Sequence, residues 1–158
     1  MQAMQSVKST KIFLWVIVLC ALIGLVNAAV VFEKAQSGGV VPCFVVSGCD
    51  QVQNSSYAHL FGVPLSLWGI GYYLVLMSFT VGIMRLISSE KIHRLMLHGW
   101  VLYVGFGFLF SLYLLYLQIF PIGALCSSCL LSLADMMVGA ASAVIVWKRM
   151  RQNTNSSQ

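Results

Sequence analysis

The chain has 158 residues, of which 59% are hydrophobic and only 8% are charged. Soluble domains carry about 25% charged residues, so this composition excludes a water-soluble globular surface and indicates an integral membrane domain. The formal net charge of +5 does not indicate nucleic-acid binding, because the nine basic residues form short clusters beside apolar runs, without interleaved aromatic residues.

Four apolar runs are long enough to cross a hydrocarbon core about 30 Å thick. The first follows a short leader with Lys8 and Lys11 and is interrupted only by Asn27. Its length favours a retained span over a cleaved signal peptide, the alternative suggested by the small residues at 27–29. The sequence predicts one all-α membrane domain over residues 1–158, a four-helix bundle with spans near 12–32, 63–84, 95–120 and 124–147.

The connections between these spans differ in length. Residues 33–60 form the only sizeable polar segment between spans, and their turn-forming residues predict a loop with a short surface helix. Pro64 is expected in the first turn of the second span, where proline is tolerated. Pro121-Ile122-Gly123 predicts a minimal turn between the third and fourth spans.

Basic residues are distributed unequally between the two sides of such a bundle. Four spans place both termini and the second connection on one side of the membrane. Of the basic residues, only Lys34 then lies on the other side. The basic residues of the first side are Lys8, Lys11, Arg85, Lys91, Arg94, Lys148, Arg149 and Arg151. The positive-inside rule therefore predicts cytoplasmic termini, with the first loop and the last turn facing outward.

Four of the five cysteines fall on this outward, oxidising side, where disulfides persist. Cys126 and Cys129 lie three residues apart at the start of the last span, so they share a helix face. The positive end of the helix favours a thiolate, which indicates a redox pair. Cys43 and Cys49 are close enough to bridge within the first loop. Cys20, in the middle of the first span, is interpreted as a small buried apolar residue.

Two other uses of these thiols stay open. The first is a non-catalytic membrane protein with structural disulfides, although a bridge between residues 126 and 129 closes almost no loop and would stabilise little. The second is a thiol-based metal-handling protein. A zinc site is disfavoured because the two pairs lack the compact spacing of zinc ribbons.

The order of several motifs carries a family resemblance. They are Cys43-x5-Cys49, Cys49-Asp50-x-Val52-x-x-Ser55-x-Tyr57, Phe61-Gly62-Val63-Pro64-Leu65-Ser66 and Cys126-x-x-Cys129. In this order, over nearly the whole chain, they resemble the bacterial form of the vitamin K epoxide reductase family. The other four-helix quinone-linked family, of the DsbB type, carries its Cys-x-x-Cys pair in the first outward loop, the reverse of the order here.

The resemblance implies a thiol relay that ends at a quinone, ubiquinone or menaquinone. Cys43 and Cys49 would exchange disulfides with a partner, Cys49 would pass electrons to Cys126, and Cys129 would deliver them to the quinone. Many bacterial relatives carry a thioredoxin-like domain fused after a fifth span. No fifth span is seen here, so the expected partner is a separate periplasmic DsbA-like thioredoxin-fold protein. The implied function is a disulfide-generating oxidoreductase of the bacterial inner membrane.

The resemblance also implies a quinone-binding serine. Ser55 corresponds to a family serine near the quinone carbonyl, although Ser56 beside it leaves the assignment open by one position. The alternative is an ordinary loop or cap residue. Animal members have a tyrosine four residues after the last motif cysteine, where this chain has Leu133, so activity on an epoxide does not follow.

Other polar and aromatic residues are weaker candidates. Asp135 lies within a span, where a carboxylate is costly and often functional. It is about 240° around the helix from Cys129, so a structural acid is favoured over proton handling. His59 is interpreted as a solvated loop residue. The aromatic residues expected to serve packing or the membrane interface are Trp68, Tyr72, Tyr73 and Trp100.

Overall fold

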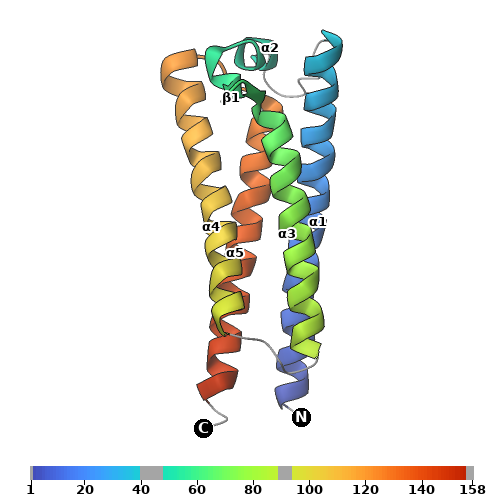
Figure 1. The fold of residues 1–158 in the computed structure, drawn as a ribbon. Coiled ribbons are helices and arrows are strands. Elements are labelled where there is room, and N and C mark those ends of the chain that lie inside the picture. Colours follow the sequence, from blue (N-terminus) through green and yellow to red (C-terminus); the bar gives the residue numbers. More distant parts are fainter. Residues whose placement is uncertain (1, 40–47, 89–93, 156–158) are drawn as a thin grey trace.

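The computed structural model describes residues 2–39, 48–88 and 94–155 and is an all-α bundle (Figure 1). Its long helices are α1 (Gln2–Ser37), α3 (Leu65–Ser88), α4 (Arg94–Leu117) and α5 (Ser127–Asn155). The stretches long and apolar enough to cross a membrane are Ser9–Ser37, Leu65–Leu86, Leu95–Ile122 and Ser127–Gln152. The predicted fold class, a membrane bundle of four helices, is confirmed.

The bundle is organised around α1 and α5. Helix α1 packs extensively against α3 and α5, and α5 also packs against α4, whereas α3 and α4 contact each other less. The core between them is filled by fully buried side chains such as Leu14, Leu76 and Val146. Large apolar side chains such as Trp15 and Leu102 are exposed, because the outer surface of a membrane bundle faces lipid rather than water.

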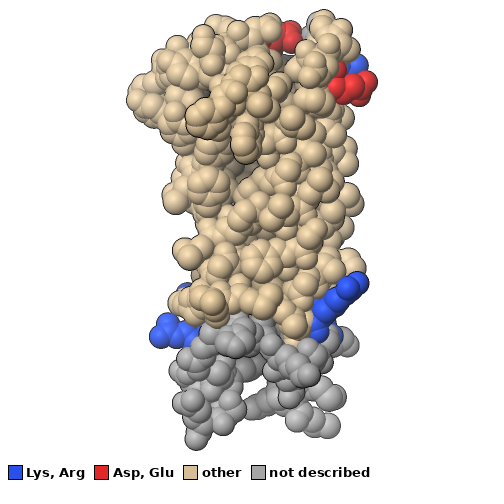
Figure 2. Space-filling view, viewed as in Figure 1, with Lys and Arg blue, Asp and Glu red and all other residues tan. Residues whose placement is uncertain are grey.

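Charged side chains mark the two ends of the bundle (Figure 2). Basic residues gather at the end where α1 begins and α5 finishes, whereas the opposite end carries Glu33 and Lys34 near the end of α1. At the basic end, Arg149 donates a hydrogen bond to the hydroxyl of Ser9 and lies 5.0 Å from the centre of the Phe13 ring. These contacts tie the last turns of α5 to α1.

A short β-hairpin precedes α3. Strands β1 (His59–Leu60) and β2 (Val63–Pro64) pair antiparallel, with His59 opposite Pro64 and Leu60 opposite Val63. The turn residues Phe61 and Gly62 both have positive φ, 55° and 77°, as a two-residue hairpin turn of type I′ requires. The prediction that Pro64 lies in the first helical turn is therefore wrong, because the hairpin takes up Pro64 and α3 begins at Leu65.

The connection from α4 to α5 is longer than the predicted minimal turn. After Leu117 the chain forms a π-helical turn, Gln118–Ile122, which contains Pro121 and ends at Gly123 in the left-handed conformation (φ 67°). The Ala124 N–H donates to the Gln118 carbonyl at 3.1 Å. Helix α5 therefore starts at Ser127 rather than at residue 124, and Cys126 lies just ahead of it.

The buried hydrogen bond between α3 and α4 yields a test of stability. The Trp100 indole N–H donates to the Thr80 hydroxyl at 3.0 Å, and that hydroxyl donates to the Leu76 carbonyl at 2.7 Å. Both residues are fully buried. Thr80→Val leaves the indole N–H without an acceptor, so we expect the free energy of unfolding to fall by about 1–3 kcal/mol.

Thermal unfolding of the purified protein in detergent measures this loss. Ser78→Ala is the matched control, because Ser78 makes the same bond to the carbonyl four residues earlier, at 2.8 Å, but on the exposed face. Equal melting temperatures for Thr80→Val and Ser78→Ala would contradict the assigned role of the buried bond.

Candidate active site

The end of the bundle opposite the two termini brings together three segments that are distant in sequence. Helix α2 (Cys49–Gln53), the hairpin and the start of α5 lie over this end (Figure 1). Cys49 opens α2, is fully buried and is disulfide-bonded. Cys43 lies outside the described residues. Cys126 and Cys129 are free thiols, so the described cysteines include both redox states.

Cys49 and Cys126 share one buried apolar cluster. Its other buried members are Val31 from α1 and Val52 from α2, and Cys129 packs at its edge. Gly48 explains how the segments approach so closely, because a Cβ atom at this position would lie 2.6 Å from the Leu125 carbonyl oxygen. Any larger residue at position 48 would push the Cys49 segment away from the Cys126 segment.

Cys126 is held by its backbone at the N-terminus of α5. Its carbonyl accepts a hydrogen bond from the Leu130 N–H at 3.0 Å, which makes Cys126 the N-cap residue. Its own N–H donates to the Gln118 side-chain oxygen at 2.8 Å, and the Gln118 amide donates to the Leu114 carbonyl at 3.3 Å. Gln118, which is buried, was not predicted as a functional residue from the sequence. The available signal was a polar amide side chain within an apolar run just before Pro121.

The surroundings of Cys126 favour its thiolate. Its pKa is lowered to about 7, chiefly by the hydrogen bond from the Cys129 thiol; burial opposes this effect. The backbone N–H groups of Ser128 and Cys129 and the side chain of Gln53 add smaller stabilising contributions. These backbone N–H groups belong to the first turn of α5, so the helix N-terminus contributes to the lowered pKa of Cys126, although the Cys129 thiol contributes most.

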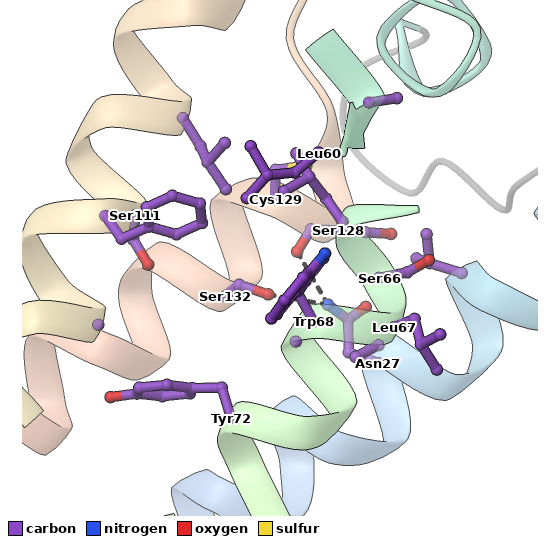
Figure 3. A pocket seen from close by; sticks show the side chains of 18 of the residues that line it. Asn27, Leu60, Ser66, Leu67, Trp68, Tyr72, Ser111, Ser128, Cys129 and Ser132 are labelled. Carbon is purple, nitrogen blue, oxygen red and sulfur yellow. Dashed lines mark hydrogen bonds between the residues drawn. The ribbon is translucent and has the colours of Figure 1, made fainter. Parts of the chain in front are cut away.

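A cavity of about 830 Å³ lies beneath the thiols, and Cys129 is part of its wall (Figure 3). This volume falls within the range of about 300–1,000 Å³ typical of small-molecule sites. Its walls are mainly apolar and aromatic, with side chains that include Trp68, Tyr72, Tyr73, Tyr103, Phe106, Phe110 and Leu114. Of the four aromatic residues expected to serve packing or the membrane interface, Trp100 is a core residue and the other three line this cavity.

Two tyrosines fasten the cavity wall between α3 and α4. The rings of Tyr72 and Tyr103 stack with their centres 4.8 Å apart. Each hydroxyl donates to the other residue's backbone carbonyl, at 3.2 Å from Tyr72 and 3.1 Å from Tyr103. These two hydrogen bonds join α3 and α4, which contact each other less than the other neighbouring helices do, and so keep the cavity between them in shape.

The polar groups of the cavity differ in how they are satisfied. The Ser55 hydroxyl donates to the Val52 carbonyl at 2.7 Å. The Asn27 amide donates to the Ser128 carbonyl at 2.9 Å and to the Ser132 hydroxyl at 3.1 Å (Figure 3). The Ser66 hydroxyl is buried and has no hydrogen-bond partner. Sequence reasoning had noticed Ser66 only as the last letter of a motif.

These residues fit a quinone headgroup. A flat ring with two carbonyl oxygens requires apolar, aromatic walls and few well-placed donors. The cavity supplies both, because the unpartnered hydroxyl of Ser66 can donate to a carbonyl oxygen and Cys129 is part of the same wall. Ser55 also lines the cavity, so the structure brings together the predicted serine and the predicted terminal thiol.

The remaining candidates lie away from this wall. His59 is exposed in strand β1, as expected of a solvated histidine. Asp135 is buried in α5 and accepts a hydrogen bond from the Cys20 thiol of α1, so Cys20 has a polar contact that its sequence context did not indicate. In the described part of the chain, no three His, Cys, Asp or Glu side chains come together as a metal site.

The fold and site define a class of protein: a four-helix membrane bundle with a thiol pair above an apolar cavity and a disulfide-bonded cysteine beside it. A comparison with protein families identifies the family within this class. The model of the vitamin K epoxide reductase family matches residues 15–146, and the chain belongs to this family. It is a multi-pass membrane thiol oxidoreductase. A comparison with curated proteins gave no match.

The lowered pKa of Cys126 is testable by titration. In reduced protein carrying Cys43→Ala and Cys49→Ala, the ultraviolet absorption of a thiolate should increase as the pH rises through about 7. Cys129→Ala should move this titration towards the ordinary thiol pKa, because it removes the hydrogen bond that lowers the value most. Cys20→Ala is the control and should leave the titration in place; an unchanged midpoint in Cys129→Ala would refute the assignment.

Proposed function

We propose that this protein is a bacterial inner-membrane enzyme that makes disulfide bonds. It oxidises a periplasmic DsbA-like thioredoxin-fold protein and reduces a membrane quinone, ubiquinone or menaquinone. The observation that carries the proposal is the continuity of the site. Cys49 and Cys126 share one buried cluster, and Cys129, one helical turn beyond Cys126, lines a cavity that fits a quinone headgroup.

The relay consists of thiol–disulfide exchanges. A partner thiolate attacks Cys43 in the disulfide of the outer pair, which forms a mixed disulfide and releases Cys49 as a thiolate. Cys49 then attacks Cys126 in the oxidised inner pair and releases the sulfur of Cys129. The second partner thiol resolves the mixed disulfide and releases Cys43 as a thiolate. Cys43 then attacks Cys49 in the Cys49–Cys126 disulfide, which restores the outer disulfide and releases Cys126. The partner thus loses two electrons and two protons, which reduce the disulfide of the inner pair.

The acid–base properties of Cys126 support this order. A good leaving thiol has a low pKa, and Cys126, whose pKa is about 7, is the thiol released when Cys43 attacks Cys49. The Cys129 thiol donates a hydrogen bond to Cys126 and also borders the cavity, so it can connect the exchange site with the acceptor. When bound, the quinone supplies the terminal electron acceptor.

Two serines are available to hold a quinone carbonyl oxygen. We assign the main contact to Ser66, because its buried hydroxyl lines the cavity without another partner. Ser55, the residue implied by the family resemblance, lines the same cavity, but its hydroxyl proton is engaged by the Val52 carbonyl. Ser55 can donate to a quinone only by giving up that bond.

The charge distribution supports an orientation. Basic side chains of α1, α3 and α5, including Lys11, Arg85 and Lys148, lie towards one end of the bundle (Figure 2). By the positive-inside rule this end is cytoplasmic, which puts both termini inside. The end with Cys49 and Cys126 then faces the periplasm, where a thioredoxin-fold partner can reach it.

Single substitutions test the relay. We expect Cys43→Ser, Cys49→Ser, Cys126→Ser and Cys129→Ser each to abolish quinone reduction driven by a reduced thioredoxin-fold partner, measured by quinone absorbance with purified protein. Cys20→Ser should keep turnover, because Cys20 lies in the α1 span away from both pairs. Full turnover in any of the four variants would exclude the relay. Loss of turnover together with intact thermal stability would exclude a purely structural role for the disulfides.

The two serines give a comparison within one cavity. Ser66→Ala removes a donor that nothing else in the cavity replaces, so the KM for decylubiquinone should rise by roughly tenfold, equivalent to about 1.4 kcal/mol. Ser55→Ala should change it less, because its hydroxyl is already bonded within the protein. Steady-state kinetics at saturating partner measures both values. A larger effect of Ser55→Ala would reassign the contact to Ser55.

A further inference from the structure

A column of polar groups continues below the cavity, between helices α1 and α5. On α5, Ser128, Ser132 and Asp135 are spaced four and three residues apart, which puts them on one helix face. They meet polar groups of α1 at two levels. Asn27 donates to Ser128 and Ser132 at the cavity, and Cys20, about two turns deeper, donates to Asp135.

Tyr73 of α3 joins the two levels of this column. Its ring packs on Gly24, where a Cβ atom would lie 2.1 Å from the Tyr73 Cζ atom and 2.6 Å from its hydroxyl oxygen. Gly24 lies between Cys20 and Asn27 along α1, so the hydroxyl enters between the upper and lower contacts. It is hydrogen-bonded to the Ser132 side chain and interacts electrostatically with Asp135 and Cys20.

Asp135 is the inner end of the column. Its side chain is buried, and its Oδ2 atom has no hydrogen-bond partner. Among the described residues it is the one buried carboxyl group, since Glu33 and Asp50 are both exposed. An ionised carboxylate within a span is costly, and an acid retained there needs a reason beyond packing. The titratable side chains that face it are Cys20 from α1 and Tyr72 and Tyr73 from α3.

We propose that Asp135 is a proton-holding site for the reduction reaction, connected to the cavity through the hydroxyl groups of Tyr73 and Ser132. Cys129 and Ser132 lie in the same cavity wall, so the column reaches the place where electrons arrive. Quinone reduction takes up two electrons and two protons, and oxidation of the inner thiol pair releases the same number. Asp135 gives one proton towards the cavity and recovers one from the thiols, so its net charge is unchanged after each turnover.

The inference rests on the proposed function and adds to it a role for the interior of the bundle. The sequence argument had placed Asp135 off the Cys129 face and favoured a structural acid. The structure shows that the angular separation does not isolate it, because Tyr73 from a third helix is hydrogen-bonded to Ser132 and lies near enough to Asp135 to interact with it electrostatically. Because Tyr73 belongs to α3, the sequence of α5 alone contains no pattern that predicts these contacts.

Turnover is the first measurement. With decylubiquinone or menadione as acceptor and a reduced thioredoxin-fold protein as donor, Asp135→Asn should reduce kcat by roughly 10²-fold, as loss of a positioned proton donor does. Asp135→Glu keeps a carboxyl group and should retain more activity than Asp135→Asn. Tyr73→Phe should also slow turnover, whereas Tyr113→Phe, a change on the exposed face of α4, should not.

Infrared difference spectroscopy is the second measurement, because a purely structural role of Asp135 would not produce a carboxyl band that changes with the redox state. The chain has only four Asp and Glu residues, so a carboxyl band is readily assigned. Reduced-minus-oxidised spectra of the protein with bound acceptor should contain a carboxylic C=O band that shifts in deuterated water. Asp135→Asn should remove this band, Asp135→Glu should move it, and Glu33→Gln should leave it in place.

The outcomes separate this inference from the function on which it rests. Lack of quinone reduction by the unaltered protein would overturn both. Normal reduction by the unaltered protein, together with wild-type kcat in Asp135→Asn, would overturn the inference alone, as would a redox-linked carboxyl band that survives in Asp135→Asn. If Asp135→Asn does not fold, the band in Asp135→Glu decides: a band at the wild-type position excludes Asp135 as its source.

Discussion

The close approach of the Cys49 segment to the Cys126 segment is the contact on which the site depends. It is possible because position 48 has no side chain and because Gln118 holds the Cys126 backbone in place. Burial of Cys49 and Cys126 in one apolar cluster puts the disulfide-bonded side of the site next to the free thiol pair. Thiol exchange requires contact between sulfur atoms, so this packing is a precondition for any relay between the pairs.

The surrounding hydrocarbon explains how the rest of the bundle is built around that contact. A polar group within a span must find its partner in the protein. Trp100 bonds to Thr80, Tyr72 and Tyr103 bond to each other's backbone, and Asn27 bonds to the first turns of α5. Each of these bonds also joins two helices, so the same requirement that satisfies polar groups also fixes the helix arrangement.

Against this background the exceptions are informative. Two buried side-chain oxygens in the described part of the chain lack a partner, one on Ser66 and one on Asp135. The first borders the cavity, and the second lies below it at the end of a polar column. Native proteins rarely leave such groups unsatisfied without a functional reason. Their positions agree with the roles proposed above: Ser66 lines the same cavity as Cys129, and Asp135 lies one helical turn from Ser132, which also lines it.

The family resemblance was visible in motif order, and the family assignment agrees with it. Composition and four apolar runs were enough to predict an all-α membrane bundle, because a hydrocarbon core admits few other architectures. Sequence spacing also predicted a thiolate at the start of the last helix, since helix polarity is a local property. The position of Pro64 was predicted wrongly, because pairing of residues 59–60 with 63–64 competes with the helix and is not encoded in helical periodicity.

By itself, then, the sequence determined the membrane fold class, the number of spans and the two candidate thiol pairs, all of which follow from local composition and spacing. Only the tertiary structure decided which residues meet. The Gln118 bond to Cys126 and the contacts of Tyr73 with Ser132 and Asp135 each join different helices or segments, and the packing of the helices leaves the Ser66 hydroxyl in the cavity without a partner. Their physical cause is the packing of α1, α3, α4 and α5 against one another, which no single stretch of the chain specifies.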